Sequence, residues 1–147
     1  MTEAYGMSEC SGPHCVGVES QFRMSSVGKV IPGAETKLGN PDEDGNGEVL
    51  MGGRHVGMGY LQQPQKTIDA IDNEGWLHSE DIGKVDKDGF LFITGRIKEL
   101  LITAGGENVA PVPIEDNVKA ALPIVSQAVV IGDRLKFLSV LLTFKVL

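Results

Sequence analysis

The chain has 147 residues, of which 41% are hydrophobic, and its 13 basic and 20 acidic side chains give a formal net charge of −7. The hydrophobic share is too high for a disordered chain, and the acidic balance argues against general nucleic-acid binding, which needs cations to displace the counterions of the phosphates. Two cysteines, Cys10 and Cys15, are too few for a disulfide-framed secreted domain, so we expect a reducing compartment. The longest apolar stretch, residues 137–144, is far too short to span a bilayer, so no transmembrane segment is expected.

Short strands separated by turns are predicted for the first two thirds of the chain. After a loop-rich start, residues 48–51 predict a short strand. Residues 65–71 predict a short helix, because Pro64 suits its first position and the apolar residues share one face. Residues 82–85 and 90–93 flank a turn-forming sequence and predict a hairpin. This run of short strands suggests part of a barrel or a sandwich, and we expect a β-barrel subdomain here.

The remaining residues predict the order β-β-α-β-β, which is an α+β pattern. The predicted helix is residues 113–122, with proline at its start and apolar residues on one face. The predicted strands are residues 100–103, 109–112, 127–131 and 137–144. We therefore expect two parts, residues 1–96 and 97–147, that meet at a short hinge.

Two metal-like patterns fail on their spacing. Residues 42–47 match the opening of a calcium loop, but the position that should carry a bidentate glutamate is Gly53. Cys10, His14 and Cys15 supply three zinc-type ligands without a fourth. We interpret the first pattern as an acidic turn, reject a zinc site, and regard His55 and His78 as ordinary packed or surface histidines.

Three other segments carry groups suited to a nucleotide. Residues 5–9 combine an aromatic ring, a glycine, a hydroxyl and a carboxylate, which can stack, admit close approach, bond phosphate and hold Mg²⁺. Asp81 enters a strand and can accept both hydroxyls of a ribose. Arg96 follows a glycine and suits charge-assisted contact with phosphate or ribose. Each segment also has a simpler interpretation: a capped turn, a hairpin-end aspartate and an ion-paired surface arginine.

In this order and spacing, the segments resemble the adenylate-forming (AMP-binding) enzymes, which include acyl-CoA synthetases. Residues 47–53 and 57–60 look like the barrel motif of that superfamily. A closer resemblance is to the bubblegum family of long-chain acyl-CoA synthetases, and it is carried by residues 5–14, 97–100, 104–109 and 111–115. It extends over residues 3–145. Residues 1–96 would be the end of the large AMP-binding domain and residues 97–147 the hinge and first half of the small domain.

The resemblance implies a role for each matching residue. The adenine would lie along the segment made by Glu3, Ala4, Tyr5, Gly6, Met7 and Ser8, with Tyr5 against its face. Ser8 would also meet phosphate, Glu9 would hold Mg²⁺, Asp81 would bind the ribose hydroxyls and Arg96 the ribose or phosphate. Lys98 would be the hinge residue, and Gly105 and Gly106 would line the channel for coenzyme A. The implied cofactors are therefore ATP or AMP, Mg²⁺ and coenzyme A.

The implied activity is activation of a long-chain fatty acid with Mg-ATP to an acyl-adenylate, followed by transfer to coenzyme A. The implied location is the cytoplasm, with peripheral association at the endoplasmic reticulum or another organelle membrane. The phosphate loop of the family should precede Tyr5 and its catalytic lysine should follow Leu147, so we expect an internal piece that is inactive alone and needs the missing parts of its parent chain.

One departure concerns the residue before the ribose aspartate. The family usually has glycine there, whereas this chain has Glu80. We expect its carboxylate to add repulsion near the phosphates, and its Cβ to exclude a positive φ.

Two other functions stay open. The chain could be a non-catalytic, truncated module that binds nucleotide or another chain, or it could belong to an adenylating enzyme that transfers no acyl group to coenzyme A.

Overall fold

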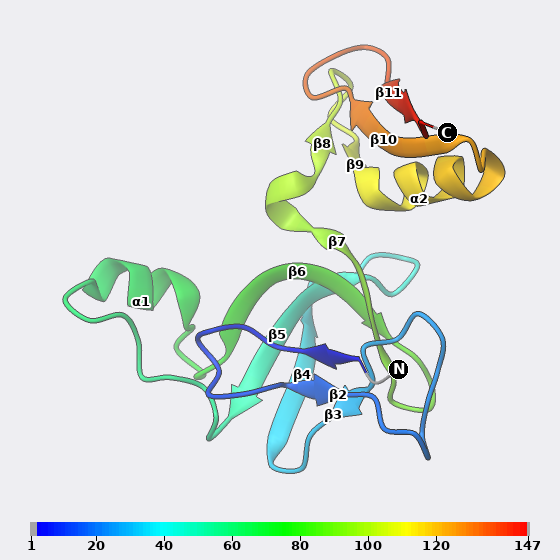
Figure 1. Ribbon diagram of the computed structural model, residues 1–147. Coiled ribbons are helices and arrows are strands. Elements are labelled where there is room, and N and C mark those ends of the chain that lie inside the picture. Colours follow the sequence, from blue (N-terminus) through cyan, green and yellow to red (C-terminus); the bar gives the residue numbers. More distant parts are fainter. Residues whose placement is uncertain (1–2, 147) are drawn as a thin grey trace. The chain divides into compact units, whose positions relative to one another are not determined.

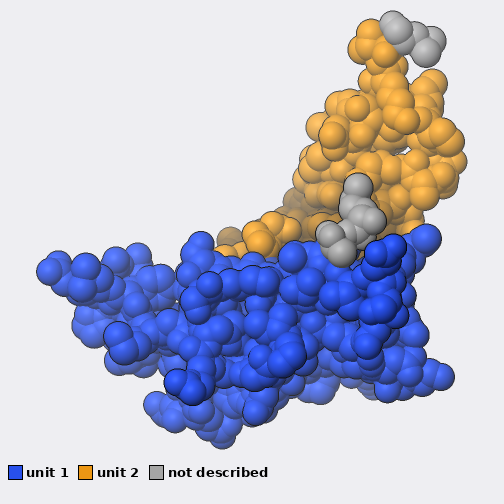
Figure 2. Space-filling view, turned by 60° about the horizontal axis from the view of Figure 1, so that its bottom comes forward, with its two compact units in different colours: residues 1–93 blue, residues 94–147 orange. Residues whose placement is uncertain are grey.

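The computed structural model describes residues 3–146 and divides the chain into two compact units, residues 1–93 and 94–147 (Figure 1, Figure 2). This division falls just ahead of the predicted boundary between residues 96 and 97, whose functional meaning remains a prediction. Each unit combines strands with one α-helix, so the fold is a mixed one dominated by sheets. Among residues 3–146, no helix is both long enough and apolar enough to cross a membrane.

The first unit begins with a small antiparallel sheet in the order β1-β2-β3. Its strands are β1 (Ala4–Tyr5), β2 (Cys15–Val16) and β3 (Lys29–Val30). Gly28 precedes β3 with a φ of +94°, and a Cβ there would lie 2.2 Å from the carbonyl carbon of Val16 and from the amide nitrogen of Gly17. Only glycine allows this backbone approach, which sets the path into β3.

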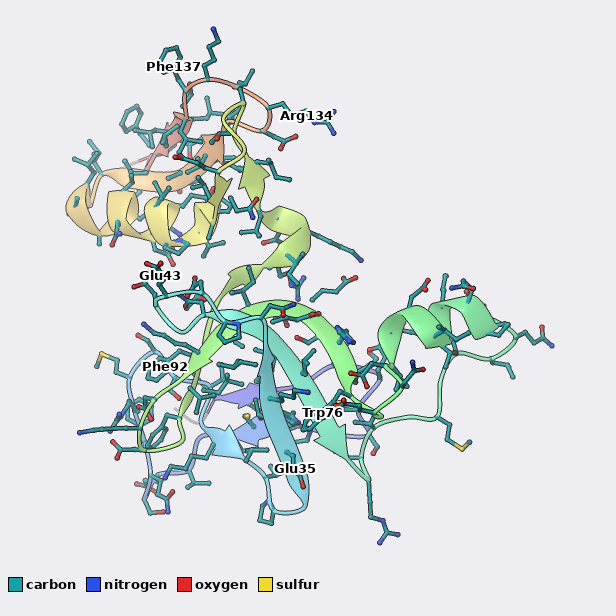
Figure 3. The ribbon with its side chains drawn as sticks, turned by 180° about the vertical axis from the view of Figure 1, so that it is seen from behind. Glu35, Glu43, Trp76, Phe92, Arg134 and Phe137 are labelled. Atoms are coloured by element: carbon teal, nitrogen blue, oxygen red, sulfur yellow. The ribbon has the colours of Figure 1, made fainter. Side chains whose placement is uncertain are left out.

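A four-stranded sheet in the order β4-β5-β6-β7 forms the rest of the first unit. Its strands are β4 (Ala34–Gly39), β5 (Gly47–Gly53), β6 (Leu77–Val85) and β7 (Leu91–Arg96). Helix α1 (Pro64–Ala70) lies between β5 and β6 in the sequence. These elements confirm the predicted strand at residues 48–51, the short helix and the hairpin, with longer strands than the pattern indicated. Trp76 lies against β5, where a Cβ on Gly52 would be 2.8 Å from the indole ring (Figure 3).

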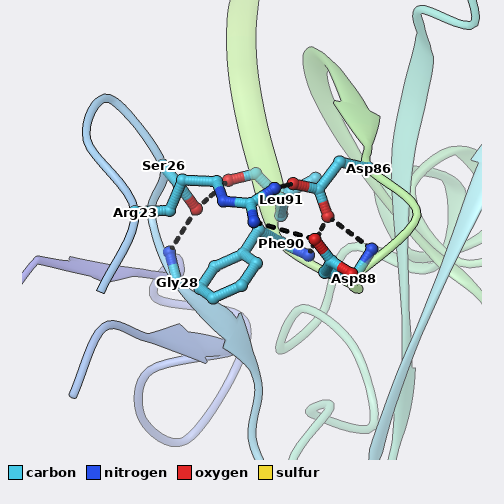
Figure 4. Close-up of polar contacts among 7 residues, drawn as sticks. All are labelled: Arg23, Ser26, Gly28, Asp86, Asp88, Phe90 and Leu91. Atoms are coloured by element: carbon cyan, nitrogen blue, oxygen red, sulfur yellow. Dashed lines mark hydrogen bonds and ion pairs between the residues drawn. The ribbon is translucent and has the colours of Figure 1, made fainter. Parts of the chain in front are cut away.

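The segment before β3 docks on the hairpin of β6 and β7 (Figure 4). Arg23 donates to Asp86 and, at 2.8 Å, to Asp88, and its guanidinium lies 4.7 Å from the centroid of the Phe90 ring. The hydroxyl of Ser26 donates to the carbonyl of Leu91 at 2.9 Å. These contacts join the two sheets of the unit at one place.

The described residues form open sheets, so the predicted β-barrel subdomain is not closed. β3 reaches the second sheet through an isolated bridge between Lys29 and Phe90, while β1 and β4 each stand at the end of a sheet. Closure requires every strand to find two neighbours around a common axis, and these strands do not supply them.

The core of the first unit lies between its two sheets and the loop that follows β1. It is apolar and contains both cysteines, which are free thiols. Its buried members are Cys10, Cys15, Val49, Met51, Leu77 and Leu91.

The second unit has the element order β8, β9, α2, β10, β11, after the short 3-10 helix η1 (Ile97–Glu99). The strands are β8 (Leu101–Ile102), β9 (Asn108–Val109), β10 (Val125–Ile131) and β11 (Ser139–Phe144), and the helix is α2 (Pro111–Ala121). Helix α2 packs on β10, where the amide of Val130 donates to Glu115 Oε1 at 2.8 Å.

Most boundaries in the second unit differ from the prediction by one to three residues. The strand predicted at residues 109–112 ends at Val109, because Pro111 already opens α2; a proline loses no hydrogen bond at that position and its φ suits a helix. The last strand begins at Ser139, and Phe137 projects from the preceding loop with 80% of its surface exposed (Figure 3).

Candidate active site

The loop between β1 and β2, residues 6–14, is folded tightly against its own ends. The amide of His14 donates to the carbonyl of Tyr5 at 2.7 Å. A Cβ on Gly6 would lie 2.9 Å from the carbonyl oxygen of Gly12, so the close approach requires glycine. The loop is also tied to the segment after β5, where the amide of Gly57 donates to the carbonyl of Glu9 at 2.7 Å. The residues predicted to meet a nucleotide therefore stand on a fixed backbone.

Tyr5 and Asp81 meet although 76 positions separate them in the sequence. The phenol of Tyr5 donates to Asp81 Oδ2 at 2.8 Å, and Asp81 is only 8% exposed. Burial, and then the neighbouring carboxylate, raise the pKa of Tyr5 well above its usual range. The phenol therefore stays protonated and keeps donating to the carboxylate at neutral pH.

A β-bulge aims Asp81 at Tyr5. The pairing of β5 with β6 shifts between Glu48–Ile82 and Leu50–His78, so three residues, Ser79 to Asp81, stand opposite Val49. Bulges of this kind turn side chains out of the regular alternation and are common beside active sites.

Glu48 and Glu80 hold the bulge in place. One oxygen of Glu48 accepts from the amide of Glu80 at 3.1 Å and the other lies 2.9 Å from His78 Nδ1. Glu80 has a φ of +60°. The expectation that a Cβ at this position excludes a positive φ is therefore wrong: the bulge imposes the left-handed conformation, and Glu80 adopts it at an energetic cost.

Glu9, the predicted cation ligand, is held by a tyrosine from another segment. The phenol of Tyr60 donates to Glu9 Oε1 at 2.5 Å. This hydrogen bond raises the pKa of Tyr60. Both residues line a pocket of about 220 Å³, here called the Glu9 pocket. Its lining residues are Ser8, Glu9, Gly57, Gly59, Tyr60, Ala70, Ile71 and Leu77.

The donor set at Glu9 suits a cation that is bound mainly by its substrate. Within residues 3–146, no group of three histidine, cysteine or acidic side chains is placed to hold a metal ion. Mg²⁺ commonly uses one or two carboxylates and takes its other ligands from water and substrate phosphates. A lone carboxylate such as Glu9 is therefore the kind of ligand that a protein offers to Mg²⁺ carried by substrate phosphates.

A second, open groove of about 450 Å³ lies beside the first strand. We call it the Tyr5 groove, and it is lined by Ala4, Tyr5, Gly6, Met7, Ser8, Cys10, Gly12 and Pro13. Ser8 borders both hollows. The carbonyl of Glu3 accepts a hydrogen bond from the amide of Gly17 at 2.8 Å, which extends the pairing of β1 with β2.

The other predicted site residues belong to the second unit. Arg96 ends β7 and Lys98 lies in η1. Gly106 has a φ of +83°, and its amide donates to the carbonyl of Thr103 at 2.9 Å in a tight turn that includes Gly105. The roles of Arg96, Lys98, Gly105 and Gly106 remain predictions.

The sequence interpretation missed a pair of histidines beside this site. His14 is fully buried, its Nδ1 lies 3.0 Å from His55 Nε2, and its Nε2 lies 2.7 Å from the Thr36 hydroxyl. Burial, and then His55, lower the pKa of His14 to about 4, while burial raises the pKa of Cys15 to about 12. Spacing could not reveal the pair, because 41 residues separate its members.

Comparison with known proteins identifies the family. The family model of AMP-binding enzymes matches residues 1–61, and that of the AMP-binding enzyme C-terminal domain matches residues 98–146. The chain belongs to the AMP-binding enzyme family.

Its close relatives within that family are bubblegum-type enzymes, as the sequence resemblance implied. The long-chain-fatty-acid–CoA ligase ACSBG2 of Xenopus laevis is 62% identical over 143 residues, which are 97% of this chain and 19% of the relative. The ligase ACSBG1 of Homo sapiens is 58% identical over 141 residues, which are 96% of this chain and 20% of the relative. The AMP-binding chain described here thus spans about one fifth of the length of these relatives.

Solved structures of adenylate-forming enzymes are similar to this chain in fold. The ATP-bound RpMatB-BxBclM chimera B3 matches with a TM-score of 0.86 and 30% identity over 98% of this chain and 30% of its own. O-succinylbenzoate coenzyme A synthetase (MenE) of Bacillus subtilis, in complex with ATP and magnesium ion, matches with a TM-score of 0.79 and 27% identity over 97% of this chain and 31% of its own.

Proposed function

We propose that the chain acts as part of a long-chain-fatty-acid–CoA ligase that forms an acyl-adenylate from a fatty acid and Mg-ATP and then passes the acyl group to coenzyme A. The observation that carries this proposal is the hydrogen bond of 2.8 Å between Tyr5 and Asp81. It brings an aromatic ring and a buried carboxylate from distant segments to one place beside the Tyr5 groove. This pair is suited to hold a nucleoside.

The two residues divide the recognition of the nucleoside between them. The ring of Tyr5 would lie against the adenine face, where stacking and apolar contact supply binding free energy. Asp81 has two oxygens that can accept from the two hydroxyls of a ribose. Ala4, Gly6 and Met7 line the same groove and would complete the wall along the base.

Charge is the main obstacle in the adenylation step, because a carboxylate must attack an α-phosphate that is also negative. Mg²⁺, when bound, neutralises part of that charge and assists departure of pyrophosphate. Glu9 would provide the carboxylate that holds the cation, and the hydroxyl of Ser8 would donate to a phosphate oxygen from the edge of the same pocket. Arg96 would supply a fixed positive charge at the ribose or phosphate.

The second unit would serve the transfer step. Lys98 would be the residue about which the unit turns between the adenylation and thioester-forming states. The turn at Gly105 and Gly106 exposes backbone without side chains and would border the channel for the pantetheine of coenzyme A.

An assay of palmitate-dependent pyrophosphate release by the full-length protein tests the proposal. We expect Asp81→Ala and Arg96→Ala each to lower kcat/KM by about 100-fold, which corresponds to about 2.7 kcal/mol of transition-state stabilisation. Met58→Ala is the matched control, because its side chain is fully exposed. Unchanged activity in both alanine variants of the proposed site residues would contradict the assignment.

Product analysis with and without coenzyme A separates the two catalytic readings. Palmitoyl-CoA as product supports the ligase, whereas palmitoyl-adenylate that persists in the presence of coenzyme A supports an adenylating enzyme without the transfer step.

A non-catalytic nucleotide-binding module is the second candidate for the 147-residue chain itself. It is favoured by the fact that the Tyr5–Asp81 pair and the Glu9 pocket are both built within residues 3–81. Calorimetry of this chain with ATP and Mg²⁺ tests it. Binding without turnover supports the module, and turnover by the isolated chain eliminates it.

The location follows from the proposed substrate. A long-chain fatty acid partitions into membranes, so we propose that the full-length protein is cytoplasmic and associates peripherally with the endoplasmic reticulum or another organelle membrane. Sedimentation with organelle fractions, with and without high salt, tests this location.

A further inference from the structure

The backbone around Tyr60 is fixed by helix α1. Gly59 has a φ of +134°, and a Cβ there would lie 2.4 Å from the Cγ2 of Thr67. The amide of Tyr60 donates to the Thr67 hydroxyl at 2.9 Å, and that hydroxyl lies 3.2 Å from the carbonyl of Gln63. Glycine is required for this contact, and it places the tyrosine against the first turn of the helix.

The same segment controls both the backbone and the side chain of Glu9. The amide of Gly57 donates to the Glu9 carbonyl at 2.7 Å, and a Cβ on Gly57 would lie 3.1 Å from that oxygen. Three residues later, the phenol of Tyr60 donates to Glu9 Oε1 at 2.5 Å. A carboxylate acceptor makes this a charge-assisted hydrogen bond, which is shorter and stronger than a neutral one.

The side chain of Glu9 depends on this bond for a defined orientation. A glutamate has several rotatable bonds, and ordering it costs conformational entropy. Tyr60 holds Oε1 of Glu9 at the wall of the Glu9 pocket. The other oxygen, Oε2, can then face the pocket without further loss of side-chain conformational entropy.

We propose that Tyr60 is a positioning residue for the cation-binding carboxylate: its hydroxyl fixes Glu9 Oε1 and thereby orients the carboxylate toward the Glu9 pocket. This inference rests on the proposed function, which assigns Glu9 to Mg²⁺. Tyr60 acts through Glu9 and needs no contact with the nucleotide.

The test compares ATP binding in Mg²⁺ with ATP binding in EDTA, by calorimetry on the full-length protein. In Tyr60→Phe, we expect the gain in ATP affinity that Mg²⁺ provides to fall about 10-fold, which is the size expected for loss of one charge-assisted hydrogen bond. The affinity for ATP in EDTA should not change, because the phenol acts only on the cation side. Met58→Ala, in the same loop and fully exposed, is the control and should match the wild type in both conditions.

Two further variants separate positioning from a general structural role. Tyr60→Phe should add nothing in a Glu9→Ala background, because the residue that it orients is absent. Thr67→Val removes the acceptor of the Tyr60 amide and should cause a smaller loss in the same direction; it also provides the readout if Tyr60→Phe fails to fold.

The inference is overturned if Mg²⁺ raises ATP affinity as much in Tyr60→Phe as in the wild type, or if it raises ATP affinity in neither. It is also overturned if Tyr60→Phe lowers ATP affinity equally in EDTA. Additive effects of Tyr60→Phe and Glu9→Ala would overturn it as well. The proposed function is judged separately by palmitate-dependent pyrophosphate release. Wild-type protein that is inactive contradicts the function, whereas active protein with an unaltered Tyr60→Phe response contradicts only the role of Tyr60.

Discussion

At the scale of single residues, Glu80 and Asp81 are neighbours with opposite surroundings. Asp81 is 8% exposed and accepts from Tyr5, whereas Glu80 is exposed and carries a φ of +60°. The bulge explains both facts, since one left-handed residue turns the next side chain toward the interior. The strained backbone conformation that directs Asp81 toward Tyr5 is therefore at Glu80.

Replacement of Glu80 by glycine should stabilise the fold. A left-handed residue with a Cβ costs about 1–2 kcal/mol, and the greater freedom of glycine in the unfolded chain offsets about half of the relief. We therefore expect Glu80→Gly to raise the free energy of unfolding by about 0.5–1 kcal/mol, measured by urea denaturation. Glu80→Gln keeps the Cβ and removes the charge, so an equal gain in that variant would show that repulsion rather than backbone strain is the cause.

His14 should make stability depend on pH. Its pKa is lowered from 6.5 to about 4 by burial and by His55, so the unfolded chain binds more protons between these values. Stability is complete above pH 6.5 and decreases as the pH falls toward 4. From pH 7 to pH 5 we expect a loss of about 2 kcal/mol from this residue.

Urea denaturation at pH 7 and pH 5 measures that loss. His14→Gln should remove it, because glutamine offers hydrogen bonds to Thr36 and His55 without a titrating ring. His78→Gln, which lies outside the buried pair, should retain it. An equal pH dependence in wild type and His14→Gln would refute the assignment.

At the scale of elements, close backbone approaches decide how the strands are connected. Gly28 and Gly33 both have positive φ values, +94° and +86°, but only Gly28 is crowded by neighbouring backbone. The first glycine brings the chain into β3 beside β2, and the second turns it out of β3 toward β4. A positive φ is therefore needed at both glycines, whereas lack of room for a Cβ is a further requirement at Gly28 alone.

Alanine at these two positions should have unequal effects. Gly33→Ala should lower the free energy of unfolding by about 1 kcal/mol, the cost of the left-handed conformation alone, because nothing lies within 4 Å of the added Cβ. Gly28→Ala carries the same conformational cost, and its Cβ would also overlap the backbone of Val16 and Gly17. We expect it to lower the free energy of unfolding by about 3 kcal/mol or more. Thermal unfolding followed by circular dichroism measures both, and equal shifts in Tm would contradict the role of backbone crowding.

At the scale of the whole molecule, the sequence was informative about elements and less so about how they combine. Alternation and turn residues predicted the hairpin and both helices to within two residues at most boundaries, because these signals are local. The expected β-barrel subdomain does not close, because closure depends on which strands find neighbours far along the chain. The pairs His14–His55 and Glu9–Tyr60 were missed for the same reason: 41 and 51 residues separate their members.

The resemblance likewise indicated some residues of the candidate site and missed others. The resemblance indicated Tyr5 and Asp81 for one nucleoside, and the structure places them in contact. It gave no reason to expect Tyr60 beside Glu9, because a motif identifies residue types in order and does not say which of them support the others.

The bond between Tyr5 and Asp81 has a consequence for ligand selection. Because Oδ2 of the buried carboxylate already accepts a hydrogen bond from a phenol, an incoming hydroxyl that takes this oxygen must displace that donor and leave the phenol to find another partner. Such an exchange yields little net free energy for a single hydroxyl, since one hydrogen bond replaces another. A diol adds a second hydrogen bond, at the other carboxylate oxygen, that a single hydroxyl exchanged at Oδ2 does not, so the resting contact would favour sugars with two adjacent free hydroxyls.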